Sequence, residues 1–450
     1  MQANKPSMLR VVVPCLLLWF SAFPVSGAAQ GTRGQNAVYN AQGNCGSSCV
    51  PSSAFIDASQ FGSNTTNICA VLNFILTPGN SIIPSTGAVI DARGLPGSTN
   101  TNMTCSSSPW AGIANPPPTN ILLPAGTITI QAGWVIPKNT HLIGQGDNLP
   151  TSQGLSSGTT IVAANSSVNP MISFCSSACT GVAIEKLVLN GNGLTVTGIK
   201  NSFAGTLSYV DHVGLYHILG TGLWINSAAA TGSGPYSNIN FTISTSVPTT
   251  ICAKIDGVNG TGGIRNLSCI NNNQVTIASA GVLLDSSNNS IKDLNIAGFT
   301  DGVLVGANAT ATNNVLINVY GDTVCCTTGT PPVVNVVHVS SNNTVSDIAL
   351  MGVSNGVNVA NQYTVRDEVT GTILPVSTDP IVGLYALGKA SNNGYARFTT
   401  SPSVPSWATG TQSPPGGSCA QGSIYSCTAS GCSHVLWGCP APGGTWAYIK

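Results

Sequence analysis

A short unit of alternating polar and apolar positions returns three times in the second half of the chain. Each copy begins with paired asparagines, at Asn288, Asn313 and Asn342, so the starts lie 25 and 29 residues apart. Isoleucine, leucine and valine follow at fixed offsets, and no helical period runs through them. A unit this short cannot bury its own apolar side chains, so successive units must stack. The pattern predicts a β-solenoid.

The same register extends toward the N-terminus and defines the residues expected to face the interior. Equivalent positions of neighbouring coils should stack about 4.8 Å apart. The stretch from Asn226 to Ile251 does not fit and is expected to loop out, and the register fades between about Thr370 and Arg397. The expected inward residues are Ile184, Leu187, Leu189, Val210, Val213, Leu215, Ile264, Leu267, Cys269, Ile291, Leu294, Ile296, Leu316, Val319, Val345, Ile348 and Leu350.

Only one segment near the start of the repeats has helical spacing. Its apolar residues are Ile68, Val71, Leu72 and Ile75, which predict a helix of about three turns. Such a helix would cap the open end of a solenoid. An extended segment should begin at Val89.

Three motifs then follow in order: LLPAGTITI from Leu122, WVIP from Trp134 and HLIGQG from His141. Together with the cap helix they resemble the opening of the pectate-lyase-like superfamily, and the similarity covers about residues 66 to 360. The resemblance implies an all-β fold, a single-stranded right-handed parallel β-helix. That superfamily includes polysaccharide lyases, glycoside hydrolases, epimerases, phage tailspikes and adhesins, so the resemblance leaves the activity open.

The termini differ in composition from the repeats. Lys5 and Arg10 precede an apolar run, and small residues follow it, which predicts a secretory signal peptide over residues 1–29. Pro14 and Pro24 interrupt the run and argue against a membrane anchor, and no later segment is long enough to span a membrane. We expect a polar linker over 30–63, the parallel β-helix over 64–398 and a small Cys/Pro/Gly-rich β-module over 399–450. Trp437 and Trp446 of that module could bind a surface or glycan; a terminal cap or spacer is the alternative.

Cysteine usage supports a secreted location, either extracellular or periplasmic and cell-surface. Of 15 cysteines, Cys15 lies in the predicted signal and the other 14 form an even set, which suggests disulfides. Zinc is disfavoured because histidines are not nearby. Cys325 and Cys326 are adjacent and could each pair elsewhere. The expected local couples are Cys45 with Cys49, Cys175 with Cys179, Cys252 with Cys269, and Cys427 with Cys432.

The chain is unusually poor in charge. Only 6% of residues are charged, whereas about 25% is average, and 42% apolar content excludes disorder. Fourteen basic and 14 acidic residues cancel, so there is no basic stripe for nucleic acid or for a polyanionic polysaccharide. No βαβ unit supports a dinucleotide site, and the sequence implies neither cofactor nor metal. The expected partner is a polysaccharide or cell-surface glycan; the oligomeric state stays open.

Registering the coils places outward residues in two neighbouring columns. Glu185 and Asp211 should lie on adjacent coils, with His212 beside them, and these three are the candidate catalytic residues. Lys186 and Arg265 are the candidate substrate-binding residues. Two carboxylates about 5 Å apart suit a retaining glycosidase, a wider pair suits inversion, and a base could instead abstract a proton in a lyase. The columns are Glu185, Asp211, Arg265, Lys292, Ile317 and Ser346, and Lys186, His212, Asn266, Asp293, Asn318 and Asp347.

Structural roles compete with these assignments. Asparagine and aspartate at solenoid corners often form ladders that satisfy turn backbone, the role expected for Asn288, Asn313 and Asn342. Glu185 could simply pair with Lys186 or Arg265. The N-x-D, D-D, G-H-G and R-x-K series of polygalacturonate hydrolases is absent as a set. Two functions therefore stay open. The first is a secreted carbohydrate-active protein that binds a neutral or weakly charged extracellular polysaccharide, with cleavage of it, as hydrolase or lyase, left open. The alternative is a non-catalytic adhesin-type or structural β-helix protein.

Overall fold

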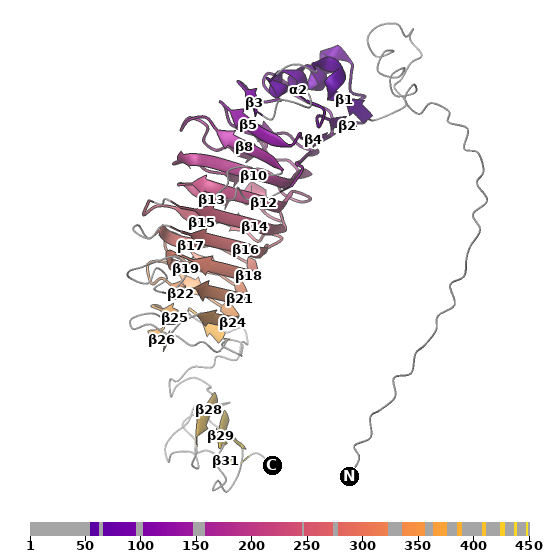
Figure 1. The fold of residues 1–450 in the computed structure, drawn as a ribbon. Coiled ribbons are helices and arrows are strands. Elements are labelled where there is room, and N and C mark those ends of the chain that lie inside the picture. Colours follow the sequence, from indigo (N-terminus) through magenta and orange to yellow (C-terminus); the bar gives the residue numbers. More distant parts are fainter. Residues whose placement is uncertain are drawn as a thin grey trace, which may run out of the picture. The chain divides into compact units, whose positions relative to one another are not determined.

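The protein is a right-handed parallel β-helix (Figure 1). The computed structural model describes residues 55–62, 66–95, 102–146, 158–244, 247–272, 278–322, 335–355, 363–375 and 385–388, with short strands beyond residue 406. The predicted signal peptide lies outside the described residues. So do Cys45, Cys49, Cys325, Cys326 and Cys432.

Two long sheets form the solenoid wall, and the chain alternates between them so that each coil adds one strand to each sheet. The first, here sheet A, runs parallel except at its last pair. In spatial order its main strands are β1 (Phe55–Asp57), β2 (Ala88–Asp91), β4 (Thr119–Leu122), β7 (Thr140–Ile143), β10 (Val182–Leu194), β12 (Tyr209–Ile218), β14 (Tyr236–Ile243), β16 (Ile264–Asn271), β18 (Ser290–Ala297), β21 (Val315–Asp322), β24 (Ile348–Asn355) and β27 (Tyr385–Leu387).

A short side branch of sheet A carries β3 (Asn102–Cys105), β5 (Gly126–Ile130) and β8 (Thr159–Ala163). The second sheet, sheet B, is also parallel until β25 meets β26. Its strands in chain order are β6 (Trp134–Ile136), β9 (Ile172–Phe174), β11 (Ile199–Asn201), β13 (Thr221–Asn226), β15 (Ile251–Asn259), β17 (Ala278–Ser287), β19 (Phe299–Val305), β22 (Asn335–Val339), β25 (Tyr363–Asp367) and β26 (Thr372–Pro375).

Strands of sheet A bend at one residue with left-handed backbone conformation. Strand β10 shows the effect, because it pairs with β7 before the bend and with β8 after it. Left-handed φ costs little for Gly and Asn but more for other residues. The bend residues of successive coils are Lys186, His212, Asn238, Asn266, Asp293, Asn318 and Gly352, with φ between 50° and 68°. This bend column explains why inward residues stand three positions apart rather than two.

The predicted cap helix is α2 (Ile68–Leu76), confirmed within one residue. Asn67 caps its N-terminus by accepting a hydrogen bond from the Ala70 backbone N–H. The predicted apolar face of Ile68, Val71, Leu72 and Ile75 is buried, whereas Phe74 is exposed. A disulfide joins Cys69 of this helix to Cys105 of β3. Short 3-10 turns flank this region and one later coil: η2 (Ala58–Phe61), η3 (Pro78–Asn80) and η4 (Ala228–Ala230). Strand β1 lies within the segment expected to be a linker.

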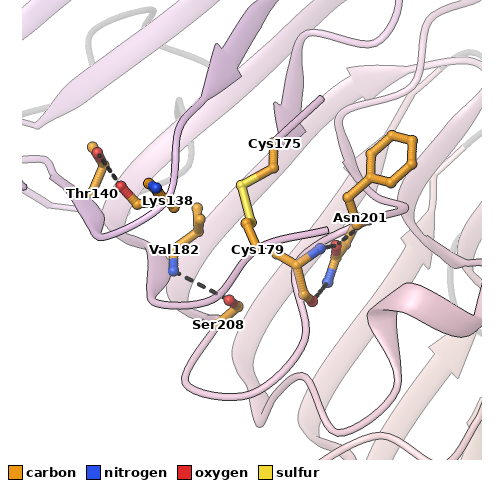
Figure 2. Close-up of a disulfide and its surroundings, with 9 residues drawn as sticks. Lys138, Thr140, Cys175, Cys179, Val182, Asn201 and Ser208 are labelled. Atoms are coloured by element: carbon orange, nitrogen blue, oxygen red, sulfur yellow. Dashed lines mark hydrogen bonds between the residues drawn. A yellow bond between two sulfur atoms is a disulfide. The ribbon is translucent and has the colours of Figure 1, made fainter. Parts of the chain in front are cut away.

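Two expected disulfides are present. Cys252 of β15 is bonded to Cys269 of β16, so this bridge links the two sheets across the interior. Cys175 and Cys179 close a corner after β9, shown in Figure 2 beside Asn201, whose amide donates to the Ala204 carbonyl. The Cys69–Cys105 bridge was not expected from the sequence, because 36 residues separate the two cysteines.

Every residue expected to face inward is buried, but two parts of the predicted register are wrong. The stretch from Asn226 to Ile251 does not loop out as a whole. It contains β14, which pairs with both β12 and β16. Tyr236 and Phe241 fill the interior there, and both are fully buried. The sequence pattern was defined by aliphatic residues, but aromatic residues fill the interior of this coil. The pattern therefore did not reveal a regular coil here.

The second error lies in the third repeat. Leu316 and Val319 pair with Leu350 and Val353 rather than with Val345 and Ile348. The coils that contain β18, β21 and β24 each have two corner residues with left-handed backbone, five residues apart. These are Asn288 and Asp293, Asn313 and Asn318, and Asp347 and Gly352. Asp347 therefore occupies the first corner, not the second. Aspartate and asparagine suit both corners, so the motif alone allowed the wrong alignment.

The expected asparagine ladder forms in part, one residue along from the predicted column. Asn314 Oδ1 accepts hydrogen bonds from the backbone N–H and the side-chain amide of Asn289, at 2.9 and 3.4 Å, and both side chains are buried. Asn289 Oδ1 in turn accepts from the Thr261 backbone N–H. The ladder thus satisfies turn backbone inside the wall, which is the role predicted for these motifs.

Two short strands, β20 (Ala311–Thr312) and β23 (Val345–Ser346), pair at a further corner. In the segment predicted to be a C-terminal module, four short strands form a separate sheet: β28 (Trp407–Gly410), β29 (Ile424–Cys427), β30 (Leu436–Gly438) and β31 (Ala447–Tyr448). Cys432, the expected partner of Cys427, and Trp446, a candidate binding residue, lie outside the described residues.

Candidate functional site

The outward column of sheet A holds the predicted site residues in register. Glu185 of β10 pairs directly with Asp211 of β12, so they occupy equivalent positions on adjacent coils, about 4.8 Å apart along the solenoid. Ser237 of β14, which the sequence register missed, follows Asp211, and Arg265 of β16 follows Ser237. Glu185 and Asp211 are therefore neighbours as predicted, and Arg265 lies two coils from Asp211.

Glu185 is held by a tyrosine that sequence reasoning did not single out. The Tyr209 hydroxyl donates a 2.6 Å hydrogen bond to Glu185 Oε1. Burial, together with the Glu185 carboxylate that accepts this hydrogen bond, raises the pKa of Tyr209 to about 12, so the hydroxyl keeps its proton at neutral pH. The ring of His141 contacts Tyr209 edge-on, with centroids 6.0 Å apart. Small Ala183 lies between them in the register.

Asp211 orients His212. One carboxylate oxygen of Asp211 accepts hydrogen bonds from the Ser237 hydroxyl and the Asn238 amide, both at 2.7 Å. The other oxygen lies 2.8 Å from Nδ1 of His212. Burial would raise the pKa of Asp211, but hydrogen bonds from Ser237, Asn238 and His212 outweigh it and hold that pKa below its usual value. Asp211 is therefore a carboxylate at neutral pH and acts as an acceptor, not as an acid.

His212 presents its other ring nitrogen to solvent. Its side chain is 49% exposed, and Nε2 has no hydrogen-bond partner among the described residues. The left-handed backbone of His212 places this ring outside the wall at the bend of β12. A ring oriented by a carboxylate at one nitrogen and free at the other is the geometry of a general base.

The two candidate substrate-binding residues lie on either side of this group. Lys186 is exposed at the bend of β10, and Arg265 is exposed on β16. Neither cation forms an ion pair with any carboxylate in the described part of the chain, so the expected rival contacts from Glu185 to Lys186 or Arg265 are not observed. Lys292 of β18 continues the column after Arg265.

A second group of ionisable residues lies on sheet B near the end of the solenoid. Nδ1 of His338 is 3.2 Å from Asp301 and Nε2 is 3.1 Å from Glu368, although neither contact has hydrogen-bond alignment. Arg366 pairs with the same Glu368 oxygen at 2.9 Å. Asn335 donates from its side chain to Asp301. The His338 side chain is only 16% exposed.

The residues that sequence reasoning missed share a cause. Tyr209 and Ser237 stand next to predicted site residues, but Tyr209 was outside the two columns and Ser237 was in the coil judged irregular. His338 was missed because no repeat motif aligned sheet B. One feature of the sequence could have indicated this group: its member Glu368 is one of only two glutamates in the chain.

Among the described residues, no three His, Cys, Asp or Glu side chains are grouped so as to hold a metal ion. In the same part of the chain, none of the helices has the length and apolarity to cross a membrane.

The fold places the chain in the class of right-handed parallel β-helix proteins. No protein-family model matches it, and no curated protein matches it. Similar solved structures include the A-module of mannuronan C-5 epimerase AlgE4 from Azotobacter vinelandii, 12% identical, with a TM-score of 0.33, covering 71% of this chain and 92% of that one.

Two viral proteins are also similar. ORF18 of Geobacillus virus E2 is 12% identical, with a TM-score of 0.32, over 66% of this chain and 61% of that one. Tailspike protein 3 of bacteriophage CBA120 is 12% identical, with a TM-score of 0.24, over 88% and 69%. Likeness at this level assigns neither a family nor an activity, so function must be argued from the side chains of this chain.

Proposed function

We propose that this chain is a secreted protein that binds an extracellular polysaccharide along sheet A and cleaves it at the group formed by Glu185, Tyr209, Asp211 and His212. One observation carries the proposal: Asp211 fixes one nitrogen of His212 while the other faces solvent. Three disulfides in the described part of the chain support an oxidising compartment. The pectate-lyase-like resemblance supports a carbohydrate substrate.

In this proposal His212 is the general base. It would take a proton from a substrate carbon or from an attacking water, and Asp211 would stabilise the imidazolium that forms. Tyr209 keeps its proton at neutral pH and is hydrogen-bonded to Glu185. It would give this proton to the leaving oxygen, and the proton held by His212 would then return to Tyr209 through water. Lys186 and Arg265 would bind substrate on the two sides of the base. A flat flank of stacked strands suits an extended chain.

A non-catalytic adhesin-type protein is the second candidate, and one observation favours it. Asn266 donates from its side chain to Asn238, and Asn238 donates to Asp211, so Asp211 ends a ladder that runs along the bend column. Such a ladder needs no substrate to explain it.

A glycan array followed by product assays separates the two candidates. The glycans that bind would be incubated with the protein and tested for new reducing ends and for unsaturated uronate. Reducing ends alone indicate hydrolysis, and unsaturated uronate indicates elimination; either supports cleavage. Binding without any product rejects the enzyme and supports the adhesin, and no glycan binding rejects both.

A further inference from the structure

An indole ring between two lysines lies on sheet B, away from the column that holds Asp211. Lys200 of β11, Trp224 of β13 and Lys254 of β15 occupy the same register position on three successive coils. The Lys200 ammonium lies 4.2 Å from the indole centroid, and the Lys254 ammonium lies 4.9 Å from it. In a chain with 14 lysines and arginines, this concentration of cations calls for an explanation.

The two lysines differ in their charge balance. Lys254 forms a 2.9 Å ion pair with Asp256, and the indole Nε1–H of Trp224 donates to the other oxygen of Asp256. Lys200 has no carboxylate at ion-pair distance within the described ranges. Asp285, the next carboxylate along the solenoid, lies beyond Asp256 on the side away from Lys200 and accepts hydrogen bonds from Asn308. The Lys200 end of the ladder is therefore net positive.

Structural stabilisation accounts for only part of this arrangement. A lysine over an aromatic ring stabilises a fold only modestly, and Lys254, paired with Asp256, already covers one face of Trp224. Lys200 is only partly exposed, and a cation that is partly buried without a counterion is desolvated at a cost. An anion bound at Lys200 would remove that cost.

The surroundings of Lys200 fit a sugar that carries an anionic group. Ser173 precedes Lys200 in the same column, and Ser202, whose hydroxyl donates to Asn226, follows Lys200 two residues later. The partly exposed edge of Trp224 offers an apolar surface beside them. An ammonium binds a carboxylate or sulfate by charge-assisted hydrogen bonds, while an indole packs against apolar groups.

We infer that Lys200, Trp224 and Lys254 form a binding site for an acidic sugar unit, an oligosaccharide bearing a carboxylate or a sulfate. The site is separate from the general-base group and does not depend on cleavage. It would let the protein hold an acidic glycan on sheet B whether or not sheet A carries out chemistry.

The test is a titration of the full chain with three oligosaccharides of equal length: neutral, carboxylated and sulfated. We expect one or both acidic sugars to bind and the neutral sugar to bind at least about tenfold more weakly. Lys200→Gln should weaken acidic-sugar binding by about tenfold, the size expected for losing a charge-assisted hydrogen bond. Lys138→Gln, at an exposed lysine before β7 (Figure 2), is the matched control and should bind as the wild type does.

The choice between carboxylate and sulfate identifies the anion, and either supports the inference. Equal binding of neutral and acidic sugars overturns it, as does unchanged binding in Lys200→Gln. A lower thermal midpoint in Lys200→Gln, with no acidic sugar bound by the wild type, would show a purely structural ladder. The Glu185→Gln variant, assayed for cleavage, separates this result from failure of the proposed function.

Discussion

Two histidines of this solenoid lie beside carboxylates, and they differ in how completely they are enclosed. His338 on sheet B has a carboxylate at each ring nitrogen and is 16% exposed. His212 on sheet A has a carboxylate at one nitrogen only and is 49% exposed. The His338 ring, with a carboxylate beside each nitrogen, can hold neighbouring coils together. The His212 ring, with a carboxylate beside one nitrogen, has the other nitrogen available for a substrate. Charge clusters in a charge-poor protein therefore need not share one role.

The sharpest test of the contrast is loss of turnover. If cleavage is found, Asp211→Asn should reduce kcat by about 10²–10⁴, the usual contribution of general acid–base catalysis, because the amide no longer orients the base or stabilises its charge. Glu185→Gln should also reduce turnover by orders of magnitude, because it removes the second carboxylate of the pair with Asp211 as well as the acceptor that holds the Tyr209 hydroxyl. Steady-state kinetics and thermal midpoints would be measured together, and the midpoints should change little.

Asp293→Asn is the control, because Asp293 is an exposed acid of the bend column on a coil beyond Arg265. It should keep wild-type turnover. Unchanged turnover in both Asp211→Asn and Glu185→Gln would reject this site. A large loss of stability in those variants would instead support the ladder interpretation.

The second effect concerns stability, which should depend on His338 more than on His212, whereas turnover should depend on the His212 group. His338→Ala should lower the free energy of unfolding by about 2–3 kcal/mol, somewhat less than the full cost of breaking a buried ion pair, because Asp301 would stay buried without its cation. His212→Ala should cost less than about 1 kcal/mol, as for exposed pairs. Chemical denaturation of both variants checks this, and equal losses would remove the distinction between the two clusters.

The third effect is a pH dependence. Burial would lower the pKa of His338, but Asp301 and Glu368 outweigh it and raise that pKa. A raised histidine pKa adds stability below the unfolded value of about 6.5, and this stability is lost as pH rises through the folded value. Burial would raise the pKa of Glu368, but His338, the Ser341 backbone N–H and Arg366 lower it. That contribution is present above about pH 4.5 and is lost as pH falls through the lowered value.

Hydrogen exchange in β22 and β25 should therefore be slowest between about pH 4.5 and 6.5 after correction for intrinsic rates. It should become faster toward pH 8, as the stability from the raised pKa of His338 is lost. In His338→Gln this loss on the alkaline side should disappear, whereas His212→Gln should retain it. A flat profile in the wild type would show that the ion pairs with His338 do not stabilise the last coils.

The smallest effect should come from Tyr209. Tyr209→Phe removes the hydrogen bond to Glu185 but keeps the ring, so we expect stability to fall by less than about 1 kcal/mol, because water can reach the partly exposed carboxylate. Turnover should fall about tenfold, below the effect of removing the base. Measurement of kcat at several pH values would show this loss of turnover. If Tyr209→Phe has the same kcat as the wild type, the hydroxyl has no catalytic role.

Stacking made much of this molecule predictable from sequence. Glu185 and Asp211 could be placed on adjacent coils because one inward residue and its neighbour three positions on define a coil. The same logic failed at Tyr236 and Phe241, where aromatic residues fill the interior, and at Asp347, where two corners accept the same residue type. Contacts made by side chains across coils, such as those of Tyr209 and His338, depend on register in three dimensions, and no repeat motif predicted them.

The bend column also shapes how this protein can change over evolution. Five of its seven members are Asn, Asp or Gly, and the two exceptions are Lys186 and His212. A residue other than Asn, Asp or Gly lowers the stability of the fold by about 1–2 kcal/mol when its backbone is left-handed. Replacing His212 with asparagine should therefore stabilise the chain while removing the base. Selection for heat resistance alone would thus favour loss of Lys186 and His212 from the candidate site. This is a trade-off between stability and activity at single residues. Persistence of the two exceptions under such selection would mark them as functional.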